Sequence, residues 1–137
     1  MFYAVIDTNV LISALLSKNS TSATVKVYDA IADGLLTPLY HRDILQEYEE
    51  VLRRPKFKFS SVRIEKLLNM IIKHGIEVFP HPTGESLVDM DDLIFYEVVM
   101  EKRECNSYLV TGNKKHYPVK TFIVTPAEMM AILEKYE

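Results

Sequence analysis

The stretch Phe2-Tyr3-Ala4-Val5-Ile6-Asp7-Thr8-Asn9-Val10-Leu11 joins a strand pattern to a helical one. Its first residues are aromatic, apolar or β-branched, which is typical of a buried strand. Apolar residues then recur at helical spacing after position 9, so we expect a helix to follow. Asp7 therefore ends the strand, at the edge of a parallel α/β sheet where ligands bind. A simple helix cap is the alternative for Asp7, Thr8 or Asn9, because all three residue types favour that position.

The composition of the chain is that of an ordinary globular protein. Its 137 residues are 48% apolar and 26% charged, so we expect one domain over residues 1–137. No apolar run approaches the roughly 18 residues of a membrane helix, and the start lacks the features of a signal peptide. We therefore expect a cytoplasmic protein without membrane attachment.

Cysteine content and net charge exclude further classes. A single cysteine, Cys105, cannot form an internal disulfide, and no Cys/His cluster has zinc-ligand spacing. We expect Cys105 to be a small residue at the edge of the core. The net charge of −3 argues against a protein that coats nucleic acid by bulk electrostatics. Acids gathered around a metal ion, with a local basic rim, remain compatible with this charge.

Strand patterns and helix patterns alternate along the rest of the chain. Strands are expected over residues 2–6, 35–40, 76–79, 107–111 and 120–124. Helices are expected over residues 23–35, 42–54, 63–74, from 89 or 91 to 104, and from a capping box at 125–128 onward, with a loop at 56–60. Pro38 weakens the prediction of the second strand, because proline has no N–H to donate to a neighbouring strand. This alternation predicts parallel pairing, right-handed crossovers and helices on both faces.

Several acids are expected at the carboxyl edge of this sheet, because each helix that follows a strand begins at that edge. Glu47 lies in the second turn of such a helix, and unlike Glu49 and Glu50 it has no arginine four residues on. An unpaired carboxylate beside the apolar stripe favours a cation or polar pocket as its partner. A boundary glutamate that reaches solvent is the alternative.

Three further acids, Asp89, Asp91 and Asp92, crowd the start of the next helix. Helix capping is the alternative here, since the macrodipole favours acids at this end, but one cap needs one aspartate. Clustered carboxylates repel each other unless a divalent cation lies among them, and oxygen ligands indicate Mg²⁺ or Mn²⁺. Thr111 and Asn113 follow the fourth strand and reach the same crevice, although Gly-Asn is also common in plain turns.

Two segments combine cations with aromatic rings, a composition suited to phosphates and stacked single-stranded bases. They are Arg53-Arg54-Pro55-Lys56-Phe57-Lys58-Phe59 and Lys114-Lys115-His116-Tyr117. The RNA-binding candidates are Arg53, Arg54, Lys56, Lys114, Lys115 and His116. The alternative is solvated helix ends with Phe57 or Phe59 in the core.

Four ordered motifs resemble those of PIN-domain ribonucleases, over essentially the whole chain. They are Ile6-Asp7-Thr8-Asn9-Val10, the helix that carries Glu47, the start Asp89-Met90-Asp91-Asp92, and Tyr108-Leu109-Val110-Thr111-Gly112-Asn113-Lys114. The chain is similar in particular to short members classed as toxins of prokaryotic toxin–antitoxin pairs. This resemblance implies a three-layer α/β/α sandwich with a five-stranded parallel sheet in the order 3-2-1-4-5. It also implies metal-dependent cleavage of RNA, a homodimer, and an antitoxin where the toxin is paired.

Carried over residue by residue, the resemblance assigns Asp7, Glu47 and Asp92 as the metal-binding, catalytic acids. The supporting residues are Thr8, Asn9, Asp89, Asp91, Thr111 and Asn113. We expect Asp7 and Asp92 to hold Mg²⁺ or Mn²⁺ directly and Glu47 to bind it or to orient the attacking water. The chain departs from the family at the fourth acid, where it has Asn113 and His116.

Two rival functions follow from these residues. The first is a non-catalytic PIN-like module that binds RNA or protein, in which the departure at Asn113 and His116 has ended turnover. The second is a phosphotransfer or receiver domain, which requires a supporting acid two residues after its aspartate nucleophile. Asn9 occupies that position, which argues against the second rival.

Overall fold

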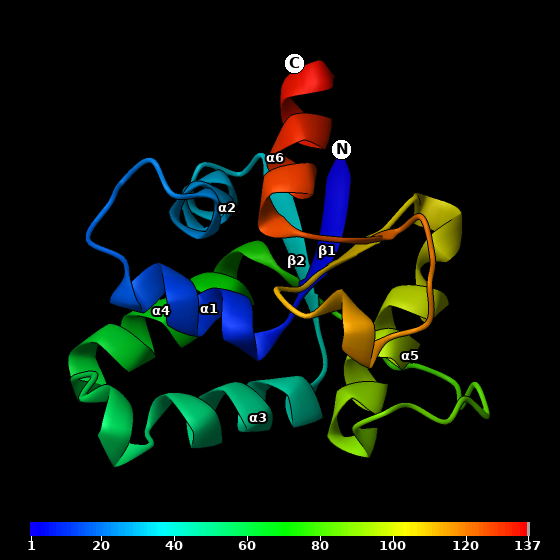
Figure 1. The fold of residues 1–137 in the computed structure, drawn as a ribbon, viewed down its shortest axis with the longest axis horizontal. Helices are drawn as coiled ribbons and strands as arrows, with labels where there is room; N and C mark the ends of the chain where they lie inside the picture. The colour runs from blue at the N-terminus through cyan, green and yellow to red at the C-terminus, as the bar shows by residue number, and fades with distance from the viewer. Residues whose placement is uncertain (137) are drawn as a thin grey trace.

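The structure, a computed structural model, describes residues 1–136 and has a parallel sheet at its centre (Figure 1). Within these residues the strands are β1 (Phe2–Ile6), β2 (Leu36–Tyr40), β3 (Ile76–Glu77), β4 (Tyr108–Val110) and β5 (Ile123–Val124). They lie in the order β3-β2-β1-β4-β5, and each neighbouring pair is parallel. The predicted order 3-2-1-4-5 is confirmed.

Helices cover both faces of the sheet. They are α1 (Thr8–Leu16), α2 (Ala23–Ala32), α3 (Arg42–Leu52), α4 (Ser61–His74), α5 (Leu93–Glu101) and α6 (Pro126–Lys135). Short 3₁₀ helices are η1 (Pro55–Phe57), η2 (Met90–Asp92), η3 (Arg103–Cys105) and η4 (Lys114–His116). α2 and α4 pack on β2, whereas α5 packs across β1, β2 and β4. Figure 1 shows α2 and α5 on opposite sides of β1 and β2, so the predicted α/β/α layering is confirmed.

Several predicted boundaries were wrong by a few residues. The strands expected over 76–79, 107–111 and 120–124 are shorter, and the helices expected over 23–35 and 42–54 end at Ala32 and Leu52. The helix expected up to residue 104 divides into η2, α5 and η3, and η1 occupies part of the expected loop. Strand length depends on the partner: β3 pairs with β2 only at Leu39 and Tyr40, which its own sequence cannot show.

The prediction that Cys105 lies at the edge of the core was also wrong. Cys105 belongs to η3 and is exposed. The helical pattern of the sequence continues almost to this residue, but α5 ends at Glu101 and residues 104–106 are exposed. The side chain is therefore a free surface thiol.

Pro38 lies in an interior strand, but at a place where the missing donor is tolerated. β1 pairs with Leu36 to Pro38, while pairing with β3 begins only at Leu39. Gly75 ends α4 against this strand: a Cβ there would lie 2.7 Å from the Pro38 carbonyl oxygen and 2.4 Å from that of Ile71. Such distances leave no space for a side chain, so glycine allows α4 to lie close to β2.

The core lies between the sheet and its covering helices. In β1, Ala4, Val5 and Ile6 are completely buried. The predicted inward positions of α2 and α5 are also buried, which confirms the helical stripes read from the sequence. No helix within residues 1–136 is long and apolar enough to cross a membrane.

Candidate functional site

The carboxyl ends of β1 and β4 lie side by side and form the floor of a cleft. Ile6 is in register with Val110, and the Asp7 backbone N–H donates to the Val110 carbonyl oxygen at 2.9 Å. The next residues along these strands, Asp7 and Thr111, are therefore neighbours. The cleft has a volume of about 260 Å³. All the predicted acids line it: Asp7, Glu47, Asp89, Asp91 and Asp92.

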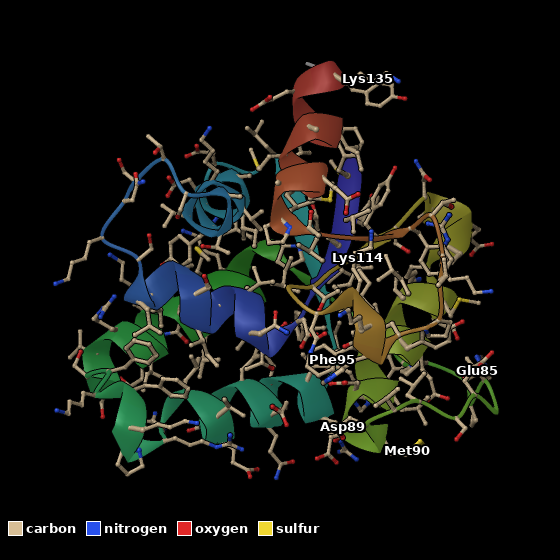
Figure 2. The ribbon with its side chains drawn as sticks, in the orientation of Figure 1. Glu85, Asp89, Met90, Phe95, Lys114 and Lys135 are labelled. Carbon is tan, nitrogen blue, oxygen red and sulfur yellow. The ribbon has the colours of Figure 1, made fainter. Side chains whose placement is uncertain are left out.

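The walls of the cleft come from distant parts of the chain. Glu47 lies on α3, the acids Asp89, Asp91 and Asp92 come from η2 and the residue before it, and α5 contributes Phe95. Asn113 and His116 approach from the segment after β4. Figure 2 shows Asp89 and Phe95 near the beginning of α3, with Lys114 on the segment after β4. The cleft thus gathers all of the sequence motifs at one edge of the sheet.

Asp7 is held by a buried pair of hydroxyl donors. Only 6% of the residue is exposed, and its Oδ2 accepts hydrogen bonds from Thr111 Oγ1 at 2.8 Å and from the Tyr117 hydroxyl at 2.9 Å. Burial raises the pKa of Asp7, and these hydrogen bonds act in the opposite direction. Asp7 occupies the N-cap position of α1 but makes no side-chain capping bond in the described chain. Capping therefore does not explain this residue.

Asp92 lies across the cleft from Asp7. Burial, followed by the charge of Asp7, raises the pKa of Asp92 to about 6. His116 Nδ1 lies 3.1 Å from Asp92 Oδ2, and this contact lowers the pKa against those effects. The two aspartates thus repel each other in a partly desolvated setting.

Glu47 is linked to α1 and lies near a cation. Thr8 Oγ1 donates to Glu47 Oε2 at 3.5 Å. Burial and then Glu50 raise the pKa of Glu47, whereas Arg54 lowers it. Glu47 has no arginine four residues on, and a cation is nevertheless near it, because Arg54 lines the same cleft. The expected pairing of Arg54 with Glu50 was wrong, since no such ion pair forms within residues 1–136. The sequence spacing alone could not show which way this arginine turns.

The remaining acids at the cleft differ in their contacts. Asp89 caps η2, since its Oδ1 accepts from the Asp91 N–H at 2.9 Å. The capping alternative therefore holds for this aspartate. Asp91 is exposed at the rim, and its charge contributes to the raised pKa of Glu47.

The turn after β4 is tied to α1. Asn9 Oδ1 accepts from the Gly112 N–H at 2.9 Å, and a Cβ at Gly112 would lie 3.2 Å from that oxygen. The Asn113 N–H donates to Thr111 Oγ1 at 3.0 Å. These contacts fix the turn, and Asn113 also lines the cleft.

The donor set of the cleft suits a hard divalent cation, which binds carboxylate oxygens. Asp7 and Asp92 are close enough for one charge to raise the pKa of the other, and a cation between them would relieve that repulsion. Within residues 1–136, no group of three Asp, Glu, His or Cys side chains comes together as a metal site. The three predicted metal ligands, Asp7, Glu47 and Asp92, are thus not gathered into one such group, although the charge of Asp7 raises the pKa of both other acids.

The predicted RNA-binding residues divide into those that line the cleft and those held elsewhere. Arg54 and His116 line it. Arg53 forms ion pairs with Glu49 at 3.2 Å and Glu65 at 4.0 Å. Lys114 pairs with Glu128 at 3.2 Å.

The other basic candidates lie outside the cleft. Lys115 is exposed, and Lys56 Nζ lies 5.1 Å from the centroid of the Phe57 ring. Phe57 stacks on Phe59 with centroids 5.6 Å apart, so each ring has a protein partner on one face. Both phenylalanines are half-buried, between the two alternatives read from the sequence.

Two tyrosines that were not predicted to lie at the cleft support it. Tyr117 donates to Asp7, and the buried Tyr48 donates its hydroxyl hydrogen bond to the Ile6 carbonyl oxygen, next to Asp7. A buried tyrosine must place its hydroxyl on a partner, so Tyr48 on the apolar stripe of α3 was the available signal. Tyr117 was read from the sequence as an aromatic ring of the Lys114–Tyr117 segment suited to stacked bases, but it is buried and its hydroxyl donates to Asp7.

This parallel sheet with acids at its carboxyl edge defines a class of α/β proteins with a polar, cation-compatible cleft. A model of the PIN domain family matches residues 3–115 of the chain. The chain therefore belongs to the PIN-domain family, as the sequence motifs indicated. No curated protein and no solved structure matches it. Family membership supports a nuclease-type function that acts on nucleic acid, and PIN nucleases typically use divalent metal ions.

Proposed function

We propose that this protein is a metal-dependent ribonuclease that hydrolyses RNA phosphodiester bonds. The observation that carries the proposal is the pair of partly desolvated carboxylates, Asp7 and Asp92, at the carboxyl edge of the sheet. Desolvated acids that repel each other reduce stability, and such acids in a cleft are typical of a functional site. The family match supports the nuclease class.

In the proposed reaction, Asp7 and Asp92 would hold Mg²⁺ or Mn²⁺ through carboxylate oxygens. The bound ion would supply Lewis-acid stabilisation of the charge that develops on the phosphate. Thr111 and Tyr117 fix the orientation of Asp7 through their hydrogen bonds to Oδ2.

Glu47 orients the attacking water in this proposal. Its carboxylate lines the cleft and accepts a hydrogen bond from Thr8. A pKa raised by burial brings a carboxylate closer to the range in which it accepts a proton near neutral pH. As Glu47 takes a proton from this water, the water oxygen forms a bond to phosphorus and the P–O bond to the leaving ribose oxygen breaks. The leaving oxygen takes up a proton from solvent water, and no covalent enzyme intermediate forms.

The proposal extends to the biological setting. The resemblance to short single-domain toxins supports the role of toxin in a toxin–antitoxin pair, with a homodimer and a protein antitoxin as partners. Induced expression should then arrest growth of a bacterial host, and Asp7→Asn should remove the arrest at equal protein level. Arrest by both proteins would reject cleavage as its cause.

A second candidate function has one specific observation in its favour. His116 stands where the family resemblance leads us to expect an acid, and it contacts Asp92 directly. A non-catalytic RNA- or protein-binding module would tolerate this contact. Its signature is binding that is indifferent to Mn²⁺.

Cleavage of a labelled mixed RNA pool tests the proposal, with Mg²⁺, Mn²⁺ or a chelator present. Asp7→Asn keeps the size of the side chain and removes its charge. Asp33→Asn, at the exposed end of α2, is the matched control. We expect metal-dependent cleavage by the wild type and the control, and none by Asp7→Asn. Cleavage by Asp7→Asn at the wild-type rate would reject the mechanism.

A further inference from the structure

A hollow runs along α1, away from the acidic cleft. Asn9 and Ile12 line the cleft and also line a shallow depression over the exposed face of α1. Ser17 lines that depression and a second pocket beyond the end of the helix. The cleft, the depression and this second pocket therefore adjoin one another. We call the last of them the distal pocket.

The distal pocket has a volume of about 390 Å³ and lies among α1, α2, α4 and the segment after α1. Its charged lining residues are Lys18, Arg63, Lys66 and Asp29. Cations therefore outnumber acids here, in a chain whose net charge is −3. Lys18 and Lys66 form no ion pair within residues 1–136, so their charges are available to a ligand.

Arg63 is positioned before any ligand binds. Its Nη2 donates to the Leu15 carbonyl oxygen at 2.8 Å, which satisfies a carbonyl at the end of α1. Its guanidinium lies 5.5 Å from the centroid of the Phe59 ring, and Phe59 in turn stacks on Phe57. A guanidinium has five N–H donors, so Arg63 retains donors for an anion. Such preorganisation lowers the entropic cost of binding.

The position of these cations in α4 is unfavourable for the isolated helix. Arg63 and Lys66 lie in the first two turns of α4, where the macrodipole disfavours positive charge. Glu65, between them, is engaged with Arg53 of the preceding segment. An anion in the pocket would interact favourably with both cations and with the amino end of α4.

Tyr28 provides an aromatic wall with a neutral hydroxyl. It is half-buried in the distal pocket, and burial and the neighbouring Asp29 raise its pKa. The hydroxyl therefore stays protonated near neutral pH and can donate to an anion. A half-exposed ring is also suited to contact with a base.

We propose that the distal pocket binds a phosphate group of the substrate RNA strand, through Lys18, Arg63 and Lys66. This inference rests on the proposed ribonuclease function and names a part of the substrate site. α1 has nine residues and rises by about 1.5 Å per residue, so the pocket lies about 12 Å along the helix from the catalytic acids. The strand then follows the hollow over α1, and a dinucleotide is too short to occupy both ends.

Two binding measurements test the subsite. In the Asp7→Asn background, which prevents turnover, Lys18→Ala with Lys66→Ala removes the unpaired cations. Lys73→Ala with Lys120→Ala removes the same charge from exposed positions outside these hollows. Fluorescence anisotropy with a labelled 12-nucleotide single-stranded RNA should give a Kd raised about tenfold by the first pair and less than about twofold by the control pair. The slope of log Kd against log salt should also fall, by about 0.7 for each phosphate that the first pair no longer neutralises.

Equal Kd values and salt slopes for the two double variants would overturn the subsite. Cleavage in the otherwise wild-type protein separates this result from failure of the proposed function. Lys18→Ala with Lys66→Ala should lower kcat/KM for the 12-nucleotide RNA and leave a dinucleotide unaffected. An equal loss on both lengths would overturn the placement of the subsite beyond the cleft. Absence of any cleavage, with RNA affinity still dependent on Lys18 and Lys66, would reject catalysis and retain the phosphate site.

Discussion

His116 Nδ1 lies 3.1 Å from Asp92 Oδ2, so the residue at the family's missing acid bonds to a carboxylate of the cleft. Burial and the charge of Asp7 raise the pKa of Asp92, while His116 lowers it through a hydrogen bond and through its own charge. The contact therefore offsets part of the repulsion between the two aspartates. It also gives the departure from the family motif a structural role.

Substitution of His116 should change the titration of Asp92. His116→Ala removes the hydrogen bond and the charge, so the pKa of Asp92 should rise above about 6 in the metal-free protein. His116→Asn can retain a hydrogen bond without the charge and should give a smaller rise. Carbon NMR of the Asp92 carboxyl against pH measures both. An unchanged or lower pKa in His116→Ala would show that His116 does not support the ionised carboxylate.

The stability of the metal-free protein should depend on pH through Asp92. The ordinary pKa is 3.8 and the folded value is about 6, so the folded state binds this proton more tightly. The stabilisation that comes from this tighter proton binding at Asp92 is complete below pH 3.8 and is lost as the pH rises through about 6. Asp92→Asn should thus raise the free energy of unfolding at pH 7.5 by about 1 to 2 kcal/mol, after allowance for solvent screening, and should have little effect at pH 3.5. Urea unfolding at both pH values measures this, and an equal effect at both would contradict the assignment.

Removal of the Tyr117 hydroxyl should weaken metal binding. Tyr117→Phe keeps the ring and deletes one donor to Asp7 Oδ2. Partners that orient a metal-binding carboxylate are typically worth about tenfold or more in affinity or activity, so we expect a loss of that size in Mn²⁺ affinity. Calorimetric titration measures the affinity, with the buried Tyr96→Phe outside the cleft as the control. Equal affinities for the two variants would remove Tyr117 from the support of Asp7.

Arg54 and Arg53 should differ in their effect on RNA, although they are adjacent. Arg54 lines the cleft, whereas Arg53 is engaged with Glu49 and Glu65. Arg54→Ala should weaken binding of single-stranded RNA and reduce the salt slope by about 0.7, the value for one phosphate on a single strand. Arg53→Ala should leave affinity unchanged, because exposed ion pairs contribute mainly small amounts of stability. Anisotropy across a salt series compares them, and matching losses of affinity would place both arginines on the RNA.

The order of the sheet and the gathering of acids could be predicted from the sequence. The change from a strand pattern to a helix pattern at Asp7 locates the carboxyl edge of the sheet. The alternation of strands and helices then places Glu47 and Asp92 at the same edge. The capping box of Thr125 and Glu128 is likewise local and is confirmed by reciprocal hydrogen bonds of 2.8 and 3.1 Å. These features depend on short-range chemistry and on one topological rule.

The contacts within the cleft could not be predicted, because they depend on how distant segments meet. Tyr117 reaches Asp7 across 110 positions of sequence, and His116 reaches Asp92 across 24. The Arg53–Glu49 ion pair is the pairing four residues apart that the sequence predicts, whereas the contact of Arg53 with Glu65 and the place of Arg54 in the cleft depend on other segments. The ends of β3 and β5 are set by their partner strands and not by their own residues.

A cation held by Asp7 and Asp92 is the centre of the proposed chemistry, and electron paramagnetic resonance can count bound Mn²⁺. The proteins to compare are the wild type, Asp7→Asn, Asp92→Asn and the control Asp33→Asn. We predict that wild type and control bind Mn²⁺ with the same affinity, at a site that either cleft substitution removes while the fold is kept. Binding of Mn²⁺ that is equal in all four proteins, or absent from the wild type, would contradict a cation site at Asp7 and Asp92.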